Sequence, residues 1–104
     1  MSFWVYILAC ADNSYYVGHT DDLGKRMAQH DSGELGGYTA SRRPVRLVYS
    51  QAFQTREQAF AVERQLKGWS RKKKEALISG DWELLRILAR GRNRESAHPS
   101  TGSG

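Results

Sequence analysis

The chain has 104 residues, which is enough for one small domain with a modest core. It carries 16 Lys and Arg residues against 11 Asp and Glu, and the net charge of +5 favours a polyanionic partner such as nucleic acid. On charge alone, a basic surface without such a partner is an equal alternative. The single cysteine, Cys10, excludes an internal disulfide and a cysteine-rich zinc site. Without a membrane-spanning run or a signal-peptide pattern, we expect a cytoplasmic protein with no membrane partner.

The first expected element is a β-hairpin. Residues 4–8 and 15–17 are rich in β-branched and aromatic side chains, and residues 12–14 supply turn chemistry between them. Side chains alternate between the two faces of a strand, so Tyr6 and Tyr16 can share one face of the hairpin. The pattern therefore predicts two phenols side by side.

A helix is expected directly after the hairpin. Gly18 is predicted to end the second strand, and Thr20 or Asp21 to cap the helix. Arg26 and His30 are four residues apart, so they lie on one face of this helix and present a cation and an imidazole together.

The next interval, residues 31–44, lacks apolar periodicity and is predicted to be a loop that carries Arg42 and Arg43. A third strand is expected over residues 45–49, running on towards Phe53. The fold class is therefore α/β, more narrowly α+β, with a small three-stranded antiparallel sheet flanked by helices.

The composition of the third strand predicts that helices cover the sheet. Alternation would place Val45, Leu47 and Tyr49 on one face. Arg46 and Val48 would lie on the other face, so neither face is wholly polar.

A second helix is expected to begin after Thr55, which forms a capping box with Gln58, and to run to about Lys67. Glu63 falls on the apolar stripe of this helix or at its edge. A carboxylate in such a place needs a basic group, a hydrogen bond or a cation. The stripe itself consists of Ala59, Phe60, Val62 and Leu66.

After Gly68 the chain is strongly basic, with six Lys and Arg residues in the eleven positions from 64 to 74, and Ser70 can cap a short helix there. Such a run is a solvated face or, with Trp69 inside it, a surface that binds and stacks single strands. The predicted nucleic-acid contacts are Arg42, Arg43, Lys67, Trp69, Arg71, Lys72, Lys73 and Lys74.

A last helix is predicted from Trp82 to about Arg90, with its apolar side chains, Trp82 among them, packed on the body of the protein. We expect residues 1–92 to form one domain and residues 93–104 to form a disordered polar tail.

Two short motifs carry a resemblance to a known family. Residues 4–6, Trp-Val-Tyr, and residues 16–18, Tyr-Val-Gly, stand where the two motifs of the GIY-YIG nuclease domain stand. Arg26 and His30 follow the motif glycine by eight and twelve residues, and Glu63 lies on a later helix, as in that family. The chain resembles the small single-domain members most, over residues 3–80.

The resemblance implies a divalent-metal-dependent endonuclease that hydrolyses phosphodiester bonds in DNA rather than RNA, with DNA repair as its setting. It would select structure rather than sequence. The resemblance also implies one Mg²⁺ or Mn²⁺ ion on Glu63, which suits a hard ion that keeps water and phosphate ligands.

The same resemblance implies a role for each of the other side chains. Tyr16 would be the general base and Tyr6 would orient the water or the phosphate. Arg26 can bind the scissile phosphate through two hydrogen bonds, and a histidine can donate to phosphate or relay a proton. The residues with predicted catalytic roles are Tyr6, Tyr16, His19, Arg26, His30 and Glu63.

Other readings remain open. The two tyrosines can be cross-strand packing partners, Arg26 can pair with Asp22, and His30 can be an exposed helix residue. At the level of function, the alternatives are a catalytically weak or inactive nucleic-acid-binding module and an adaptor whose protein partner contacts Trp69 or Trp82.

Overall fold

The structure, a computed structural model, describes residues 2–97. The chain divides after Gly68 into two compact units. The predicted domain limit at residue 92 stays a prediction. No helix in the described part of the chain is both long and apolar enough to cross a membrane.

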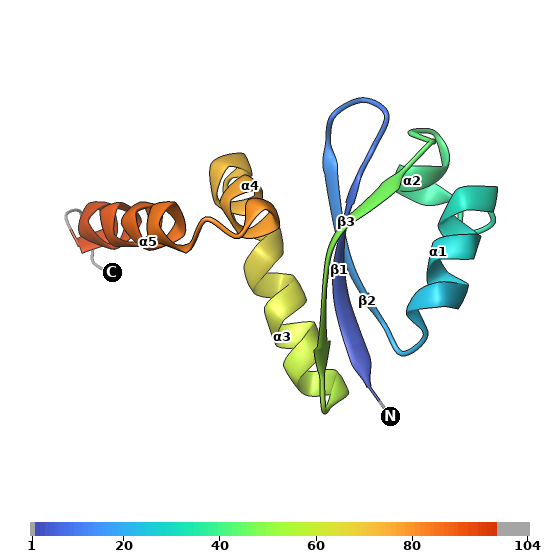
Figure 1. The fold of residues 1–104 in the computed structure, drawn as a ribbon, viewed down its shortest axis with the longest axis horizontal. Helices are drawn as coiled ribbons and strands as arrows, with labels where there is room; N and C mark the ends of the chain where they lie inside the picture. Colours follow the sequence, from blue (N-terminus) through green and yellow to red (C-terminus); the bar gives the residue numbers. More distant parts are fainter. Residues whose placement is uncertain (1, 98–104) are drawn as a thin grey trace. The chain divides into compact units, whose positions relative to one another are not determined.

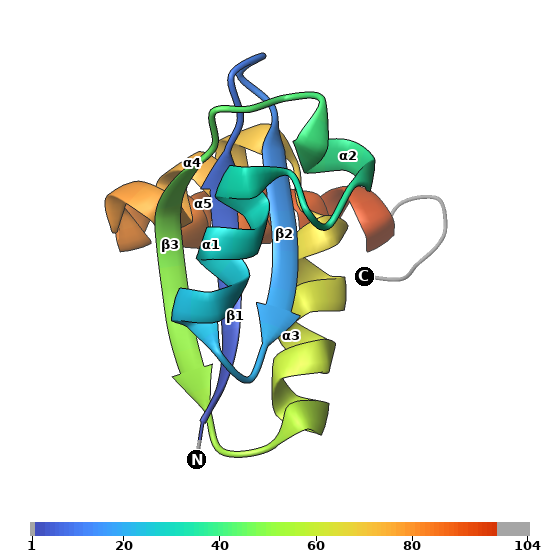
Figure 2. The ribbon, with the colours of Figure 1, turned by 90° about the vertical axis from the view of Figure 1, so that its right-hand side faces the viewer.

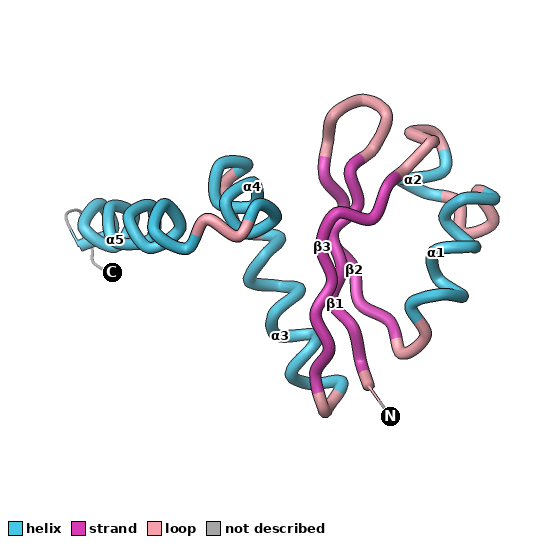
Figure 3. The backbone as a smooth tube through the Cα atoms, in the orientation of Figure 1, coloured by secondary structure: helices cyan, strands magenta, loops and turns pink. Residues whose placement is uncertain are grey.

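The first unit contains an antiparallel sheet of three strands (Figure 3). Their order in the sheet is β2-β1-β3. Strand β1 spans Phe3–Ala9, β2 spans Tyr15–Thr20 and β3 spans Arg46–Phe53. The predicted fold class is confirmed. Since β1 is the central strand, it supplies the largest fully buried side chains of the described residues, which are Val5, Tyr6, Ile7 and Leu8.

Helices cover both faces of this sheet, as predicted. Helices α1, Leu23–Ser32, and α2, Gly37–Ala40, lie on one side (Figure 1). Helix α3, Arg56–Lys67, lies on the other side and contacts all three strands (Figures 1 and 2). We call these sides the α1 face and the α3 face.

Gly18 does not end the second strand, which is a correction to the sequence analysis. Strand β2 continues to Thr20, and Gly18 pairs with Tyr6 of β1. A Cβ atom at position 18 would lie 2.6 Å from the Tyr6 hydroxyl oxygen. Glycine is therefore needed because the Tyr6 ring crosses the neighbouring strand, and not because the chain turns there.

The start of α1 also differs from the prediction. The helix is capped by Asp22, whose carboxylate accepts a hydrogen bond from the Lys25 amide at 3.1 Å. Neither Thr20 nor Asp21 is the capping residue. Asp22 has extended backbone geometry and a short acceptor side chain, which are the two properties that a helix cap requires.

The prediction that Leu47 and Tyr49 share a face is wrong. The pairing of β1 with β3 shifts between Ile7 and Leu8, so that Ile7 pairs with Tyr49 and Leu8 with Leu47. Consecutive residues of β1 point to opposite faces, and their partners do the same. The extra residue, Val48, forms a β-bulge that breaks the alternation.

The loop predicted over residues 31–44 contains the short helix α2, which periodicity cannot reveal at four residues. The capping box of α3 is confirmed, because Thr55 accepts from the Gln58 amide at 3.1 Å and the Gln58 side chain reaches back. Phe60 is 48% exposed and does not belong to the buried stripe. The buried residues of α3 are Ala59, Glu63 and Leu66.

The second unit contains helices α4, Arg71–Ser79, and α5, Trp82–Ala97. Ser70 caps α4 as predicted, accepting from the Lys73 amide at 3.2 Å. Trp82 is 62% exposed, and its predicted packing on the body of the protein stays a prediction.

Helix α5 extends beyond its predicted end at Arg90. Residues 93–97 of the predicted tail belong to the helix. The rest of that predicted tail, residues 98–104, lies outside the described residues.

Candidate active site

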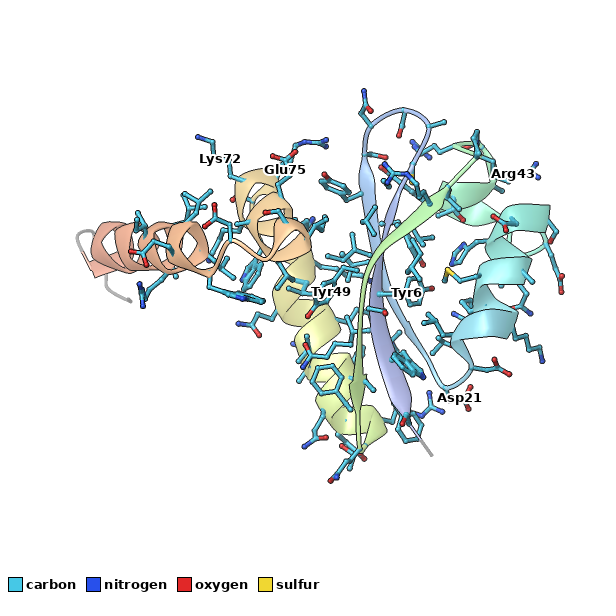
Figure 4. The ribbon with its side chains drawn as sticks, in the orientation of Figure 1. Tyr6, Asp21, Arg43, Tyr49, Lys72 and Glu75 are labelled. Atoms are coloured by element: carbon cyan, nitrogen blue, oxygen red, sulfur yellow. The ribbon has the colours of Figure 1, made fainter. Side chains whose placement is uncertain are left out.

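Tyr6, Tyr16 and His30 come together on the α1 face. Tyr6, labelled in Figure 4, is fully buried. Its hydroxyl oxygen lies 3.0 Å from Nε2 of His30, which is 2% exposed. The centroid of the Tyr16 ring lies 6.4 Å from that of Tyr6 and 5.4 Å from that of His30. The predicted juxtaposition of the phenols is confirmed, and His30 is not an exposed helix residue.

The Tyr6 phenol remains protonated at neutral pH. Burial raises the pKa of Tyr6 to about 12, although interaction with the Arg26 guanidinium lowers it in part. Because Tyr6 is sealed from solvent, it lies behind the accessible part of the site. Tyr16 and Arg26 are both partly exposed and form that accessible part.

His30 is held as a neutral imidazole. Burial lowers its pKa, and the nearby positive charge of Arg26 lowers it further. Its Nδ1 atom lies 2.8 Å from the Thr39 hydroxyl oxygen in α2, and Thr39 is 2% exposed. The sequence analysis did not identify Thr39, because the short helix that carries it was assigned to a loop.

Glu63 and His19 form a second group with Lys67. The Oε1 atom of Glu63 lies 2.5 Å from His19 Nδ1, and Oε2 lies 2.8 Å from Lys67 Nζ. The Glu63 side chain is only 9% exposed, so the expectation that it needs a partner is confirmed. Its hydrogen bond is the main cause of a raised pKa in Lys67. The exposed ring of Phe60 lies 5.6 Å from the His19 ring.

These two groups occupy opposite faces of the sheet. Tyr6 pairs with Gly18, and the next pair, Val5 with His19, points to the α3 face. Besides burial, the charge of Glu63 helps to raise the pKa of Tyr6. The two groups therefore interact electrostatically across β2, which is an edge strand of the sheet.

Tyr16 connects the same two groups. It packs against His30 on the α1 face. Besides the hydrogen bond to Glu63, interaction with Tyr16 contributes to the raised pKa of Lys67. Tyr16, like Tyr6, thus interacts electrostatically with the ion pair on α3.

A polar hollow opens beside Arg26 at the start of α1. Its lining gives Arg26 a solvent-accessible space in which a phosphate group can be bound. Tyr16 and Glu63 do not line this hollow. Its lining residues are Thr20, Asp21, Asp22, Lys25, Arg26 and Gln29.

The donor set around Glu63 fits a lightly coordinated divalent cation. Within residues 2–97, no three His, Cys, Asp or Glu side chains group together as a metal-binding cluster. A single carboxylate with water and substrate phosphate is a coordination that Mg²⁺ accepts. His19 occupies Oε1 and Lys67 occupies Oε2, so the ion would have to share an oxygen with one of them.

Arg42 makes contacts with other residues of the same chain. Its Nε donates to Asp12 at 2.9 Å, and its guanidinium lies 3.8 Å from the centroid of the Tyr38 ring. Tyr38 stacks on Tyr16, with ring centroids 6.1 Å apart. Arg42 therefore supports the wall of the site next to Tyr16, and the sequence analysis missed Tyr38 as part of it.

Arg43 joins the end of α1 to α2. Its Nε donates to the Ala40 carbonyl at 3.0 Å and an Nη to the Asp31 carbonyl at 3.3 Å (Figure 4). Gly33 has φ of 77°, and a Cβ there would lie 2.8 Å from the Arg43 guanidinium carbon. The binding of nucleic acid by Arg42 and Arg43 stays a prediction beside these structural contacts.

The basic run of α4 is not uniformly solvated. Lys73 is 7% exposed, and its Nζ lies 4.8 Å from the centroid of the Trp69 ring. Burial lowers the pKa of Lys74, and the charge of Arg71 lowers it further.

The outer part of the run is exposed. Arg71 donates to Glu75 at 3.0 Å, one helical turn away, and Lys72 extends from α4 (Figure 4). The predicted role of the run in binding nucleic acid stays a prediction.

Comparison with known proteins identifies the class of domain. The family model described as the GIY-YIG catalytic domain matches residues 2–76, which is most of the chain. The chain belongs to the GIY-YIG family, whose catalytic domain is that of a nuclease acting on nucleic acid.

Within this family, the chain is similar to small proteins named UPF0213. That name states no activity. The chain is 42% identical to the UPF0213 protein of Bacillus pumilus over 98 residues, covering 94% of this chain and 91% of that protein. It is also 43% identical to a UPF0213 protein of Streptococcus pneumoniae, covering 73% of this chain and 77% of that protein.

Two solved structures share the fold. The solution NMR structure of the UPF0213 protein BH0048 from Bacillus halodurans is 46% identical, with a TM-score of 0.51 over 76% of this chain and 84% of that one. The solution structure of EF2693 from E. faecalis is 36% identical, with a TM-score of 0.55 over 77% of this chain and 85% of that one.

Proposed function

We propose that this protein is a divalent-metal-dependent endonuclease that hydrolyses phosphodiester bonds in DNA and selects structure rather than sequence. The observation that carries the proposal is the position of Tyr16. Its ring packs against Tyr6 and His30 on the α1 face, and it interacts with Lys67, which binds Glu63 on the α3 face.

Tyr16 acts as the general base in this proposal. It is partly exposed, whereas Tyr6 is sealed and retains its proton because burial raises its pKa to about 12. Of these two motif tyrosines, only Tyr16 can reach a water molecule at the surface. The ring of Tyr38 stacked on Tyr16 limits its motion.

Arg26 binds the scissile phosphate. Its guanidinium is partly exposed, lines the polar hollow at the start of α1 and can only donate hydrogen bonds. A planar guanidinium can make two parallel hydrogen bonds to a phosphate, which stabilises the charge that develops in the transition state.

Glu63 holds the Mg²⁺ or Mn²⁺ ion. When bound, the ion would supply positive charge that polarises the phosphate and stabilises the leaving oxygen. The chain itself contributes a carboxylate that is largely buried and oriented by His19 and Lys67. Lys67, which would share the Glu63 carboxylate with the ion, also keeps its own positive charge near the site.

The choice of substrate rests on the charge of the chain. The net charge of +5 supports attraction to phosphates, which is independent of sequence. A small catalytic unit that contacts mainly phosphates would recognise the shape of branched, nicked or single-stranded DNA.

The test is a cleavage assay with end-labelled branched, nicked and single-stranded DNA, and matched RNA, in Mg²⁺ or Mn²⁺. We expect metal-dependent cleavage by the wild type and a loss of at least about 100-fold in Glu63→Gln and in Tyr16→Phe. Binding of uncleaved DNA at low salt should survive in both variants. The proposal is wrong if the wild type leaves every substrate intact with both metals.

Matched controls separate chemistry from folding. Glu57→Gln changes another carboxylate of α3, in the first turn, and Tyr49→Phe removes a phenol whose hydroxyl donates to Gln51 at 2.7 Å. Both controls should retain cleavage within about twofold, because neither residue contacts the site. A comparable loss in the controls would mean that the Glu63 and Tyr16 results reflect damaged folding.

One observation favours a second candidate, a nucleic-acid-binding module without catalysis. Both carboxylate oxygens of Glu63 already have partners, His19 and Lys67, so the carboxylate needs no metal for its burial. This module would bind DNA in a salt-sensitive manner, unaffected by Glu63→Gln, and neutralising the exposed Lys72 would weaken binding.

A further inference from the structure

Phe60 of α3 carries an aromatic ring that is open to solvent. The residue is 48% exposed, whereas Ala59 before it is fully buried. The centroid of the Phe60 ring lies 5.6 Å from that of the His19 ring, with an angle of 54° between the ring planes. Single apolar side chains are common on protein surfaces, so this exposure by itself indicates no ligand. The groups around the ring are what point to one.

Two basic side chains follow Phe60 along α3. Arg64 and Lys67 come four and seven residues after it, which places all three on one face of the helix. Arg64 is exposed, and its guanidinium carbon lies 5.7 Å from the centroid of the Phe60 ring. The side chain of Lys67 is 56% exposed. An accessible aromatic ring beside such cations is the combination by which proteins stack bases and bind the phosphates between them.

His19 joins this surface to the Glu63 group. Its ring contacts Phe60, and its Nδ1 atom lies 2.5 Å from Glu63 Oε1. Lys67 binds the other carboxylate oxygen at 2.8 Å. A base stacked on Phe60 would therefore belong to a nucleotide close to Glu63, the residue that holds the metal ion in the proposed function.

Only an unpaired base can use the Phe60 ring in this way. In a duplex, both faces of each base are covered by its neighbours in the stack, so an aromatic side chain at the protein surface cannot reach them. In a single strand or a flap these faces are accessible. The surface around Phe60 therefore suits an unpaired nucleotide better than a continuous duplex.

We propose that Phe60 stacks an unpaired nucleobase and that Arg64 binds a phosphate of the same strand, next to Glu63. The Arg64 guanidinium can only donate hydrogen bonds, which suits a phosphate. The proposal rests on the proposed function where it places this nucleotide beside the reaction, and it narrows the substrate to DNA with at least one unpaired nucleotide. The stacking itself is tested without cleavage.

NMR of the wild type tests the stacking directly. The chain has three phenylalanines, Phe3, Phe53 and Phe60, so two of them serve as internal controls. Protein with ¹³C-labelled phenylalanine rings is titrated with a short oligothymidylate in EDTA, and a Phe60→Leu sample assigns the signals of Phe60. The ring current of a stacked base should shift the Phe60 signals upfield, and by more than those of Phe3 and Phe53. Phe60 signals that move no more than the other two at saturation would overturn the proposal.

Affinities separate contact with the base from contact with the phosphates. The two ligands are the oligothymidylate and an oligomer of equal length and charge that lacks bases. For Phe60→Leu we expect Kd to rise about 10-fold for the first ligand and less than about twofold for the second. Phe60→Trp, which keeps an aromatic face, should bind both as the wild type does. An equal loss for both ligands, or no loss for either, would contradict base stacking.

Arg64→Met tests the phosphate contact. This variant should weaken the binding of both ligands alike, because it removes a cation and leaves the ring in place. Arg56→Met is the matched control, since it removes the same charge from an exposed arginine of the same helix that contacts Phe3 and Asp21. A loss in Arg64→Met no larger than that in Arg56→Met would show that Arg64 binds no phosphate.

Cleavage of flapped DNA tests the link to the reaction. In Phe60→Leu we expect kcat/KM for a substrate with an unpaired flap to fall about 10-fold, and Phe60→Trp to restore it. An unchanged kcat/KM in Phe60→Leu would refute the role of this surface in cleavage. If the wild type cleaves nothing, the proposed function fails, and the NMR and affinity results still decide whether Phe60 stacks a base.

Discussion

The two faces of the sheet hold chemically different groups. On the α1 face, Tyr6, His30 and Thr39 are at most 2% exposed and are joined by hydrogen bonds between uncharged groups. On the α3 face, Glu63 forms charged contacts, and its partner Lys67 has a side chain that is 56% exposed. The first face is a preorganised support, whereas the second is charged and partly open to solvent. Catalysis in this fold would require both.

The largest expected effect comes from breaking the α1 face at Gly18. Gly18→Ala places a Cβ atom 2.6 Å from the Tyr6 hydroxyl oxygen and 3.2 Å from the Tyr16 ring. Since both rings are confined, we expect the free energy of unfolding to fall by about 3 kcal/mol, measured by urea denaturation. A change below about 1 kcal/mol would show that the Tyr6 ring is free to move.

Gly24→Ala in α1 is the matched control for this substitution. Its Cβ would meet nothing closer than an Asp22 carboxylate oxygen at 3.9 Å. Alanine is the better helix former, so Gly24→Ala should stabilise the protein by about 0.5–1 kcal/mol.

Alkaline titration should destabilise the α1 face through Tyr6. The folded pKa is raised to about 12, above an unfolded value near 10. Between these values the unfolded chain loses its Tyr6 proton while the folded chain keeps it, so stability falls by about 2–3 kcal/mol as pH rises. In Tyr6→Phe, the loss of stability over the same pH range should be smaller by about 2–3 kcal/mol. Parallel pH curves for the wild type and Tyr6→Phe would contradict the assignment.

Lowering the pH should destabilise the α1 face through His30, by less than alkaline titration does through Tyr6. Burial and the charge of Arg26 lower the pKa of His30 in the folded state. Below about pH 6.5 the unfolded chain binds a proton that the folded chain resists, so stability decreases as pH falls from there. Denaturation curves at pH 7.5 and 5 should differ less in His30→Gln than in the wild type; an equal difference would exclude His30 as the cause.

The smallest change in stability is expected on the α3 face. Lys67→Met removes a cation that is half exposed, so the stability should change by less than about 1 kcal/mol. The vacated carboxylate oxygen should bind a divalent ion more readily, and Mn²⁺ should raise Tm more than in the wild type. Lys72→Met is the control, and an equal Mn²⁺ response in Lys67→Met and the wild type would argue against Glu63 as the metal ligand.

The sequence predicts the features of this fold that depend on neighbouring residues. The turn between the first two strands and the caps at Thr55 and Ser70 are local, because a side chain there binds a backbone amide three residues away or less. The sharing of a face by Tyr6 and Tyr16 follows from strand alternation.

Features that depend on distant residues were missed. Gly18 is needed because the Tyr6 ring crosses β2 at this position. The residues next to Gly18 in the sequence do not indicate this contact. The bulge at Val48 arises from the pairing of β3 with β1, and Thr39 contacts His30 only when α2 packs near it. The order of residues also does not show that Glu63 lies on the opposite face from Tyr6.

The central claim is that Tyr16 on one face and Glu63 on the other serve a single reaction. A double-mutant cycle of single-turnover DNA cleavage in Mn²⁺ tests it most directly, with wild type, Tyr16→Phe, Glu63→Gln and the double variant. We predict that the double variant is no slower than the slower single variant, because each loss removes the same step. Losses that multiply, or a wild-type rate of cleavage in either single variant, would contradict a shared active site.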